Sequence, residues 1–202
     1  MQILKVFSDY ICPFCFIGKQ RVDRLTAEFP IEAVWRPFEI HPEVPSEGIG
    51  LSRFLPGIIS NLEASVRRLA EEIGLEIRMP AKLPNSRMAL LGGEVARERG
   101  VFDDYHSAVL RAYFQESKDI GDLDTLAEIA EGAGMDGGYF REAVISGKHA
   151  DALADSIGEA RSLGLTGVPS FVFSNGGVVI GAQPYDVLKR AAEESFRSQA
   201  GR

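Results

Sequence analysis

The chain has 202 residues, of which 45% are hydrophobic and 25% are charged, and its formal net charge is −7. This length suits one large domain or a domain with an inserted subdomain, with a core that needs no disulfide. The acidic balance argues against nucleic acid as a partner, and the lack of a long apolar run argues against a membrane span.

The N-terminal part of the chain predicts a βαβ unit. Residues 2–7 (QILKVF) predict a first strand, and residues 31–38 (IEAVWRPF) predict a second. Between them, Pro13 suits the first turn of a helix that ends at Pro30, with charged residues such as Arg21 expected on its solvent side. A helix of this length usually connects parallel strands.

From about residue 51 the pattern becomes helical, after a loop expected over residues 41–50. The expected helical segments are 61–74, 86–100, 103–117, 122–134, 138–146 and 150–164. Gly74, Gly100 and Gly134 stand where C-terminal caps are expected.

The end of the chain returns to a β pattern. Residues 169–173 and 178–182 predict a hairpin with a glycine-rich turn, and residues 185–199 predict a last helix. We therefore expect an α/β fold of the order βαβ…ββα, interrupted by a large, all-helical inserted subdomain. The expected domains are residues 1–45 with 165–202, and the insertion 46–164.

Both cysteines of the chain, Cys12 and Cys15, lie where the first strand gives way to the first helix. Backbone N–H groups and the positive end of the helix dipole would stabilise a thiolate on Cys12. A thiolate attacks a disulfide, and a second thiol one turn later can resolve the mixed intermediate. The spacing therefore favours a redox pair, with Cys12 as the nucleophile and Cys15 as the resolving thiol.

Three simpler interpretations compete with a redox pair. A structural disulfide closing so short a loop would constrain the unfolded chain little. Zinc would need about four ligands, and the available histidines, His41, His106 and His149, show no ligand spacing, so we expect no metal. Inert buried thiols are disfavoured because Pro13 places the pair at a helix end.

The chain resembles the DsbA-like branch of the thioredoxin-fold superfamily, and in particular its FrnE-like members. The resemblance lies in four segments that span nearly the whole chain: SDYICPFCFIGK (8–19), RPFEIHPEVPSEG (36–48), RAYFQESKDIGD (111–122) and LTGVPSFVFSNGGVVIGAQPYDVL (165–188). It implies a thioredoxin fold split by a helical insertion, with dithiol–disulfide exchange as the activity.

The resemblance also implies further site residues. Val168–Pro169 corresponds to the cis-proline site, which would face the sulfurs and leave the backbone of Val168 free to pair with an extended substrate. From the residues alone, an ordinary trans proline at the start of a strand would be the better interpretation. Gln183 belongs to a turn expected beside the same substrate groove.

Two residues near the cysteines are expected to modulate the site. Phe14 stands where the most oxidising DsbA proteins have histidine, so we expect a weaker oxidant, because phenylalanine cannot stabilise a neighbouring thiolate as an imidazolium does. Phe14 would either contact substrate or pack beneath the loop. Asp9 would either assist proton transfer or cap the turn.

The leading functional hypothesis is a thiol–disulfide oxidoreductase or isomerase with no bound cofactor. Its partners would be disulfide-containing proteins or small thiols, with glutathione or thioredoxin as possible electron donors. No signal-peptide pattern precedes the first strand, so we expect a cytoplasmic protein. Whether it is a monomer or a homodimer stays open.

Two alternatives remain. A glutathione-dependent kappa-type transferase or 2-hydroxychromene-2-carboxylate isomerase needs one nucleophile at position 12 and no resolving thiol. A non-catalytic peptide-binding redox sensor would use the groove without turnover.

Overall fold

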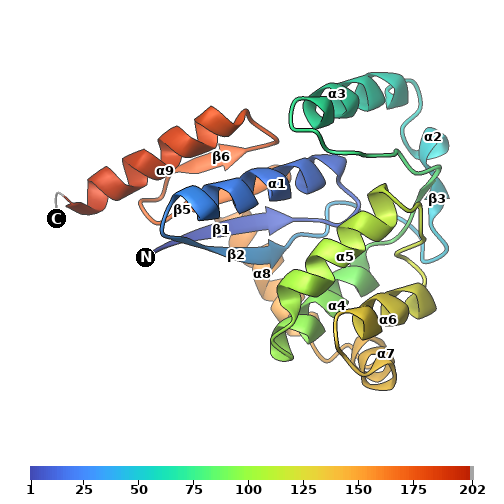
Figure 1. The fold of residues 1–202 in the computed structure, drawn as a ribbon. Helices are drawn as coiled ribbons and strands as arrows, with labels where there is room; N and C mark the ends of the chain where they lie inside the picture. Colours follow the sequence, from blue (N-terminus) through green and yellow to red (C-terminus); the bar gives the residue numbers. More distant parts are fainter. Residues whose placement is uncertain (201–202) are drawn as a thin grey trace. The chain divides into compact units, whose positions relative to one another are not determined.

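A computed structural model of the chain describes residues 1–200 (Figure 1). It divides into two compact units. The first unit joins Met1–Ile40 to the segment from Ser156 through the last helix, and the second is His41–Asp155. The chain therefore leaves the first unit once and returns to it, and the inserted unit spans 41–155 rather than the expected 46–164.

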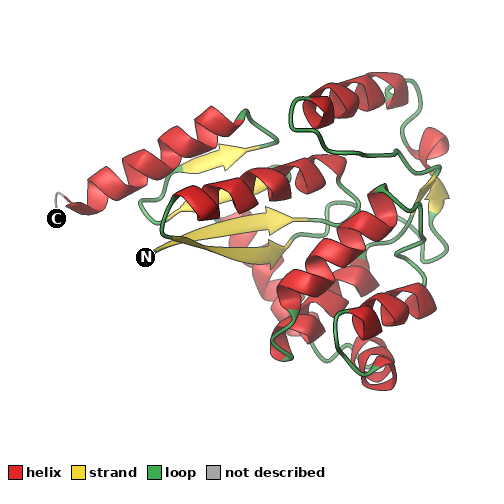
Figure 2. Cartoon of the chain, in the orientation of Figure 1, coloured by secondary structure: helices red, strands yellow, loops and turns green. Residues whose placement is uncertain are grey.

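The first unit is built on a four-stranded mixed sheet in the order β2-β1-β5-β6 (Figure 2). Its strands are β1 (Gln2–Ser8), β2 (Ile31–Pro37), β5 (Ser170–Phe173) and β6 (Val178–Ile180). β1 and β2 are parallel, which confirms the βαβ unit. β5 is antiparallel to both β1 and β6, so the predicted hairpin is present.

Helices cover both faces of this sheet. On one face, α1 (Pro13–Glu28) packs closely on β5, and α9 (Tyr185–Ala200) lies beside α1, with Phe29 stacked on Phe196. On the opposite face, Phe7 of β1 packs with Ala160 of α8 (Ala150–Ser162). Side chains that alternate along β1 therefore enter two separate cores.

The second unit is mainly helical, as predicted. It contains α3 (Ile59–Glu71), α4 (Arg87–Glu98), α5 (Phe102–Phe114), α6 (Leu123–Gly132), α7 (Gly137–Ile145) and the start of α8. Gly74, Gly100 and Gly134 have φ values of +65°, +73° and +91°, so each is the left-handed glycine predicted shortly after the end of a helix.

The second unit also contains elements that the sequence pattern did not indicate. The short helix α2 (Leu51–Phe54) follows strand β3 (Ile49–Gly50), which pairs with β4 (Lys82–Leu83). Strands of two residues are too short for an alternating pattern to be recognised, so a region expected to be loop and helix contains a small antiparallel ladder.

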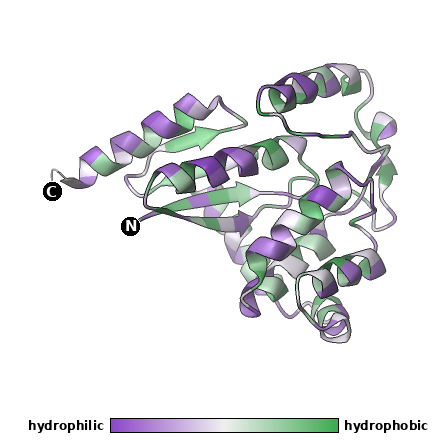
Figure 3. Ribbon diagram, in the orientation of Figure 1, coloured by the Kyte–Doolittle hydropathy of each residue, from purple (hydrophilic) through white to green (hydrophobic). Residues whose placement is uncertain are grey.

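Hydropathy follows burial in α9 but not in β6, where Val178 and Ile180 are 43% and 39% exposed. Figure 3 shows hydrophilic and hydrophobic residues alternating around α9, whereas β6 is hydrophobic throughout. Among the residues that the structure describes, no helix is long and apolar enough to cross a membrane.

Candidate active site

The two cysteines lie at the beginning of α1. Cys12 is the N-cap residue with extended backbone angles (φ −90°, ψ 114°), and Pro13 occupies the first helical position. The Cys12 N–H donates to the carbonyl of Asp9 at 3.3 Å, and the Cys15 N–H donates to the carbonyl of Cys12 at 3.0 Å. Pro13 fits because the first N–H groups of a helix have no intrahelical partner.

Both thiols are free, but their environments differ. Both residues are buried, contrary to the expectation for Cys12 at a helix end: Cys12 is 6% exposed and Cys15 is not exposed, so Cys12 is the outer residue of the pair. Burial raises the pKa of the Cys15 thiol well above its ordinary value, and the adjacent Cys12 raises that pKa further. The surroundings of Cys15 therefore favour its protonated form.

Asp9 organises the turn that precedes the helix. Its carboxylate accepts hydrogen bonds from the backbone N–H of Ile11 at 3.4 Å and of Ile40 at 2.8 Å, and the residue is 1% exposed. These contacts correspond to the turn-capping interpretation of Asp9. They also tie the end of β1 to the backbone that follows β2.

A second segment of the chain reaches the cysteines from the other end of the sequence. The Val168–Pro169 peptide bond is cis, as the resemblance implied. The Cys12 thiol donates to the carbonyl of Val168, with Sγ and O 3.6 Å apart. The outer sulfur and the segment preceding β5 thus face each other directly.

The turn after β6 lies beside this segment. The Gly181 N–H donates to the carbonyl of Pro169 at 2.7 Å, and Gly181 has the left-handed φ of +82° that glycine accommodates. The Gln183 side-chain amide donates to the carbonyl of Ile180 at 3.1 Å. Gln183 therefore stabilises its own turn through its side chain, and its contact with substrate stays a prediction.

Two charged residues of the first unit, Arg21 and Glu159, make contacts that the sequence pattern does not indicate. Arg21 was expected on the solvent side of α1, which is wrong: it is 3% exposed, and its Nη1 donates to the carbonyl of Gln183 at 2.7 Å. Glu159 of α8 bridges Lys5 at 2.5 Å and Arg36 at 3.1 Å. Neighbouring residues cannot indicate these contacts, because the partners of Arg21 and Glu159 lie more than a hundred residues away in sequence.

The histidines considered as zinc ligands lie in other environments. His41 contacts Glu43 at 3.0 Å, and His106 stacks on Phe102. His149 contacts Glu98 at 2.9 Å. Within the described part of the chain, no three His, Cys, Asp or Glu side chains are grouped so that they could hold a metal ion.

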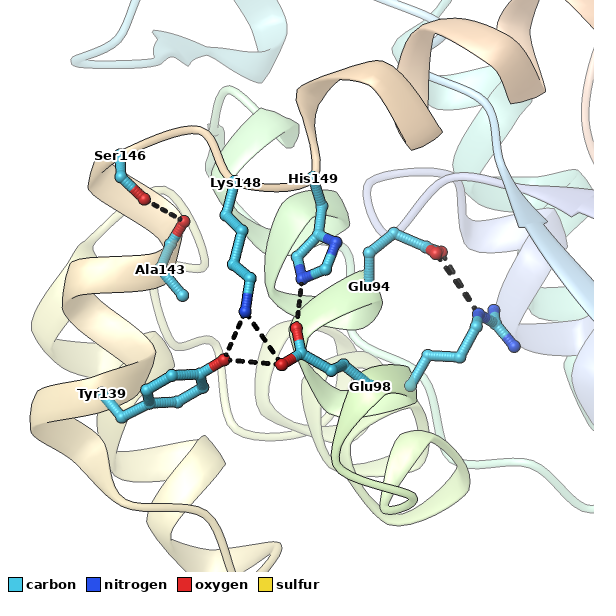
Figure 4. Close-up of polar contacts among 8 residues, drawn as sticks. Glu94, Glu98, Tyr139, Ala143, Ser146, Lys148 and His149 are labelled. Carbon is cyan, nitrogen blue, oxygen red and sulfur yellow. Dashed lines mark hydrogen bonds and ion pairs between the residues drawn. The ribbon is translucent and has the colours of Figure 1, made fainter.

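The contacts of His149 belong to a polar cluster within the second unit (Figure 4). Glu98 of α4 also accepts from Tyr139 of α7 and from Lys148, both at 2.9 Å. Hydrogen bonds from Lys148 and Tyr139 lower the pKa of Glu98 to about 2. The cluster thus connects α4, α7 and the segment before α8 through exposed groups.

A known protein family and a bacterial protein each match nearly the whole chain. The family described as DSBA-like thioredoxin domain matches residues 3–193. The uncharacterized protein YwbO of Bacillus subtilis is 32% identical over 199 residues, which cover 97% of this chain and 98% of YwbO.

Solved structures with a similar fold also cover nearly the whole chain. A probable DsbA oxidoreductase from Streptomyces coelicolor is 28% identical with a TM-score of 0.89, over 97% of this chain and 90% of that one. A 2-hydroxychromene-2-carboxylate isomerase is 18% identical with a TM-score of 0.79, over 98% of both chains, and shares the fold.

Proposed function

The chain belongs to the family of DSBA-like thioredoxin domains, and on this basis we propose that it is a thiol–disulfide oxidoreductase that works through Cys12 and Cys15. The observation that carries the proposal is the asymmetry of the two sulfurs. One thiol is the N-cap of a helix, and the other is fully buried one turn later with a raised pKa. A nucleophile and a resolving thiol need this difference.

In the reductive direction, the Cys12 thiolate attacks one sulfur of a substrate disulfide. A bond forms between Cys12 and that sulfur, and the second substrate sulfur leaves as a thiolate that takes up a proton. Cys15 then loses its proton and attacks Cys12, which releases the first substrate sulfur. Two electrons pass to the substrate, and the protein retains a Cys12–Cys15 disulfide. Oxidation of a substrate dithiol is the reverse sequence.

Val168 is the proposed docking point for substrate. Its carbonyl already accepts the Cys12 thiol at 3.6 Å, so a bound extended segment would lie within reach of the sulfur. We propose that such a segment pairs with the backbone at Val168 by strand addition, with Pro169 and Gln183 beside it. Phe14, which is half-buried, would contribute an apolar contact.

No bound cofactor takes part in this proposal, because the electrons are carried by the two cysteines. An external thiol such as glutathione or thioredoxin would reduce the Cys12–Cys15 disulfide after each turnover. The proposed location is the cytoplasm, and the proposed partners are disulfide-containing proteins or small thiols. The location would be tested by expressing the protein without an added signal peptide and by Western blotting of the cell fractions.

Insulin reduction by dithiothreitol tests the activity. Cys12→Ser should abolish turnover. Cys15→Ser, reduced, freed of dithiothreitol and then mixed with insulin, should accumulate a mixed disulfide between Cys12 and the substrate, visible as an added mass on the protein. Turnover that persists in Cys12→Ser would refute the proposed chemistry.

The same variants separate the alternative functions. The fold shared with a 2-hydroxychromene-2-carboxylate isomerase makes a glutathione-dependent reaction at Cys12 the second candidate. Such a reaction would survive Cys15→Ser, because it needs no resolving thiol. Peptide binding without any turnover would instead support the redox-sensor hypothesis.

A further inference from the structure

Arg21 is a buried cation that the exchange chemistry does not use. It lies on α1 six positions after Cys15, and 3% of its surface is exposed. Arginine is rarely buried so fully unless a specific partner compensates for its lost hydration. Its Nη1 donates to the carbonyl of Gln183 at 2.7 Å, a distance typical of a charge-assisted hydrogen bond.

This hydrogen bond begins a chain of contacts that leads to the docking point. Gln183 donates from its N–H to the carbonyl of Gly181 at 2.8 Å, and Gly181 donates to the carbonyl of Pro169 at 2.7 Å. Pro169 adjoins Val168, whose carbonyl lies 3.6 Å from the sulfur of Cys12. Three backbone-directed hydrogen bonds therefore connect Arg21 to the residue that faces the nucleophile.

A second contact holds the same segment from the side. Gly18 lies one helical turn before Arg21, and a Cβ placed there would be 3.1 Å from Cγ of Pro169 and 3.3 Å from Cζ of Phe171. These distances are shorter than the optimal carbon–carbon contact of about 3.5–4.0 Å. α1 thus approaches Pro169 as closely as glycine permits, while Arg21 holds the neighbouring turn.

We propose that Arg21 is a positioning residue for substrate docking, an inference that rests on the proposed function. The helix that carries Cys12 and Cys15 also carries the guanidinium that fixes the 181–183 turn. Through that turn, Arg21 fixes the position of the Val168 backbone, with which an extended substrate would pair. Substrates that must pair with this backbone depend on Arg21, whereas a small disulfide that only reaches the sulfur does not.

Replacement of Arg21 by methionine tests this assignment. In Arg21→Met, the apolar side chain fills much of the site but leaves the Gln183 carbonyl without its donor. We expect KM for insulin to rise about tenfold with little change in kcat, the size that corresponds to losing one such hydrogen bond. Reduction of hydroxyethyl disulfide should proceed at the wild-type rate. Arg21→Lys, which keeps a cationic donor, should recover part of the loss.

Arg24→Met is the matched control. Arg24 lies on the same helix, but its side chain is 61% exposed, pairs with Glu28 at 2.8 Å and lies over the ring of Tyr185 in α9. This variant should leave KM for insulin unchanged. Gly18→Ala provides a second perturbation of Pro169, and it should raise KM for insulin without affecting the small disulfide. It keeps the inference testable if Arg21→Met does not fold.

Two readouts separate this inference from the proposed function. The dissociation constant of a cysteine-free extended peptide requires no turnover, and it should rise about tenfold in Arg21→Met. Unchanged KM and peptide affinity in Arg21→Met would overturn the positioning role even if the wild type is active. An equal loss with insulin and with hydroxyethyl disulfide would do the same, because it would indicate a general structural role. Wild-type peptide binding without turnover would refute only the oxidoreductase proposal.

Discussion

Gly92 offers a sharp test of packing in the second unit. It lies in α4, and a Cβ added there would be 2.7 Å from Cζ of Phe140 and closer still to Oη of Tyr105. Optimal carbon–carbon contacts are about 3.5–4.0 Å, so an added methyl group would force a shift of about 1 Å. Tyr105 and Phe140 are both fully buried, so neither ring can move into solvent.

The expected effect of Gly92→Ala is the difference between two opposing terms. Alanine is favoured over glycine inside a helix by about 1 kcal/mol. Overpacking of a tight core costs about 1–3 kcal/mol and sometimes more, and two rigid rings place this site at the upper end. We expect a net loss of about 2 kcal/mol in the free energy of unfolding, which lowers Tm by about 4–8 °C for a chain of this length.

Gly158→Ala is the matched control for this prediction. Gly158 lies inside α8, and a Cβ there would meet no atom within 4 Å. The same substitution should therefore raise stability by about 0.5–1 kcal/mol. Thermal unfolding followed by circular dichroism measures both variants.

A double variant identifies the cause. Adding Tyr105→Phe to Gly92→Ala removes the hydroxyl that lies nearest to the new methyl group, so part of the lost Tm should return. If Gly92→Ala raised Tm as Gly158→Ala does, the close packing of Gly92 against the two rings would be wrong.

Three further predictions concern the first unit. Because Cys15 has a raised pKa and no exposure, iodoacetamide at pH 7 should label Cys12 of the reduced protein and not Cys15; mass spectrometry showing equal labelling would contradict this. Lys5 lowers the pKa of Glu159, so this pair stabilises the fold above the unfolded-state pKa of about 4.3 and the benefit is lost as pH falls through the folded value. Urea unfolding should thus show Glu159→Gln less stable by about 0.5–1 kcal/mol at pH 7, with the difference vanishing at low pH. Phe14→His should make the reduction potential more oxidising by about 30 mV or more, measured against glutathione, because an imidazolium stabilises the reduced thiolate form.

Most of the fold could be predicted because its signals are local. Pro13 marks the start of α1, and Gly74 and Gly134 mark helix ends through their left-handed backbone. The run of strand-forming residues in β1 and the glycine-rich turn of the hairpin depend on neighbouring residues alone. The two-residue strands β3 and β4 were missed because pairing between them depends on residues far apart in sequence.

The residues of the site likewise fall into those with a local sequence signal and those without one. Cys12 and Cys15 could be recognised from their spacing and their place before a helix, and the cis bond at Pro169 followed only from the resemblance. Arg21 was assigned to solvent because charged neighbours surround it in sequence. The carbonyl of Gln183, 162 residues away in sequence, is one partner of the buried guanidinium, and no neighbouring residue signals it.

The asymmetry of the two sulfurs links this architecture to the direction of electron flow. Reduction of the pair is favoured to the extent that the folded protein stabilises one thiolate. Burial disfavours a thiolate at Cys15, so in the proposed exchange the charge would fall on Cys12, at the N-terminus of α1 and beside the uncharged Phe14. A pair that stabilises its thiolate through the helix alone should be a weaker oxidant than DsbA, whose potential is about −120 mV. A measured potential as oxidising as that value would require a source of thiolate stabilisation other than the N-terminus of α1.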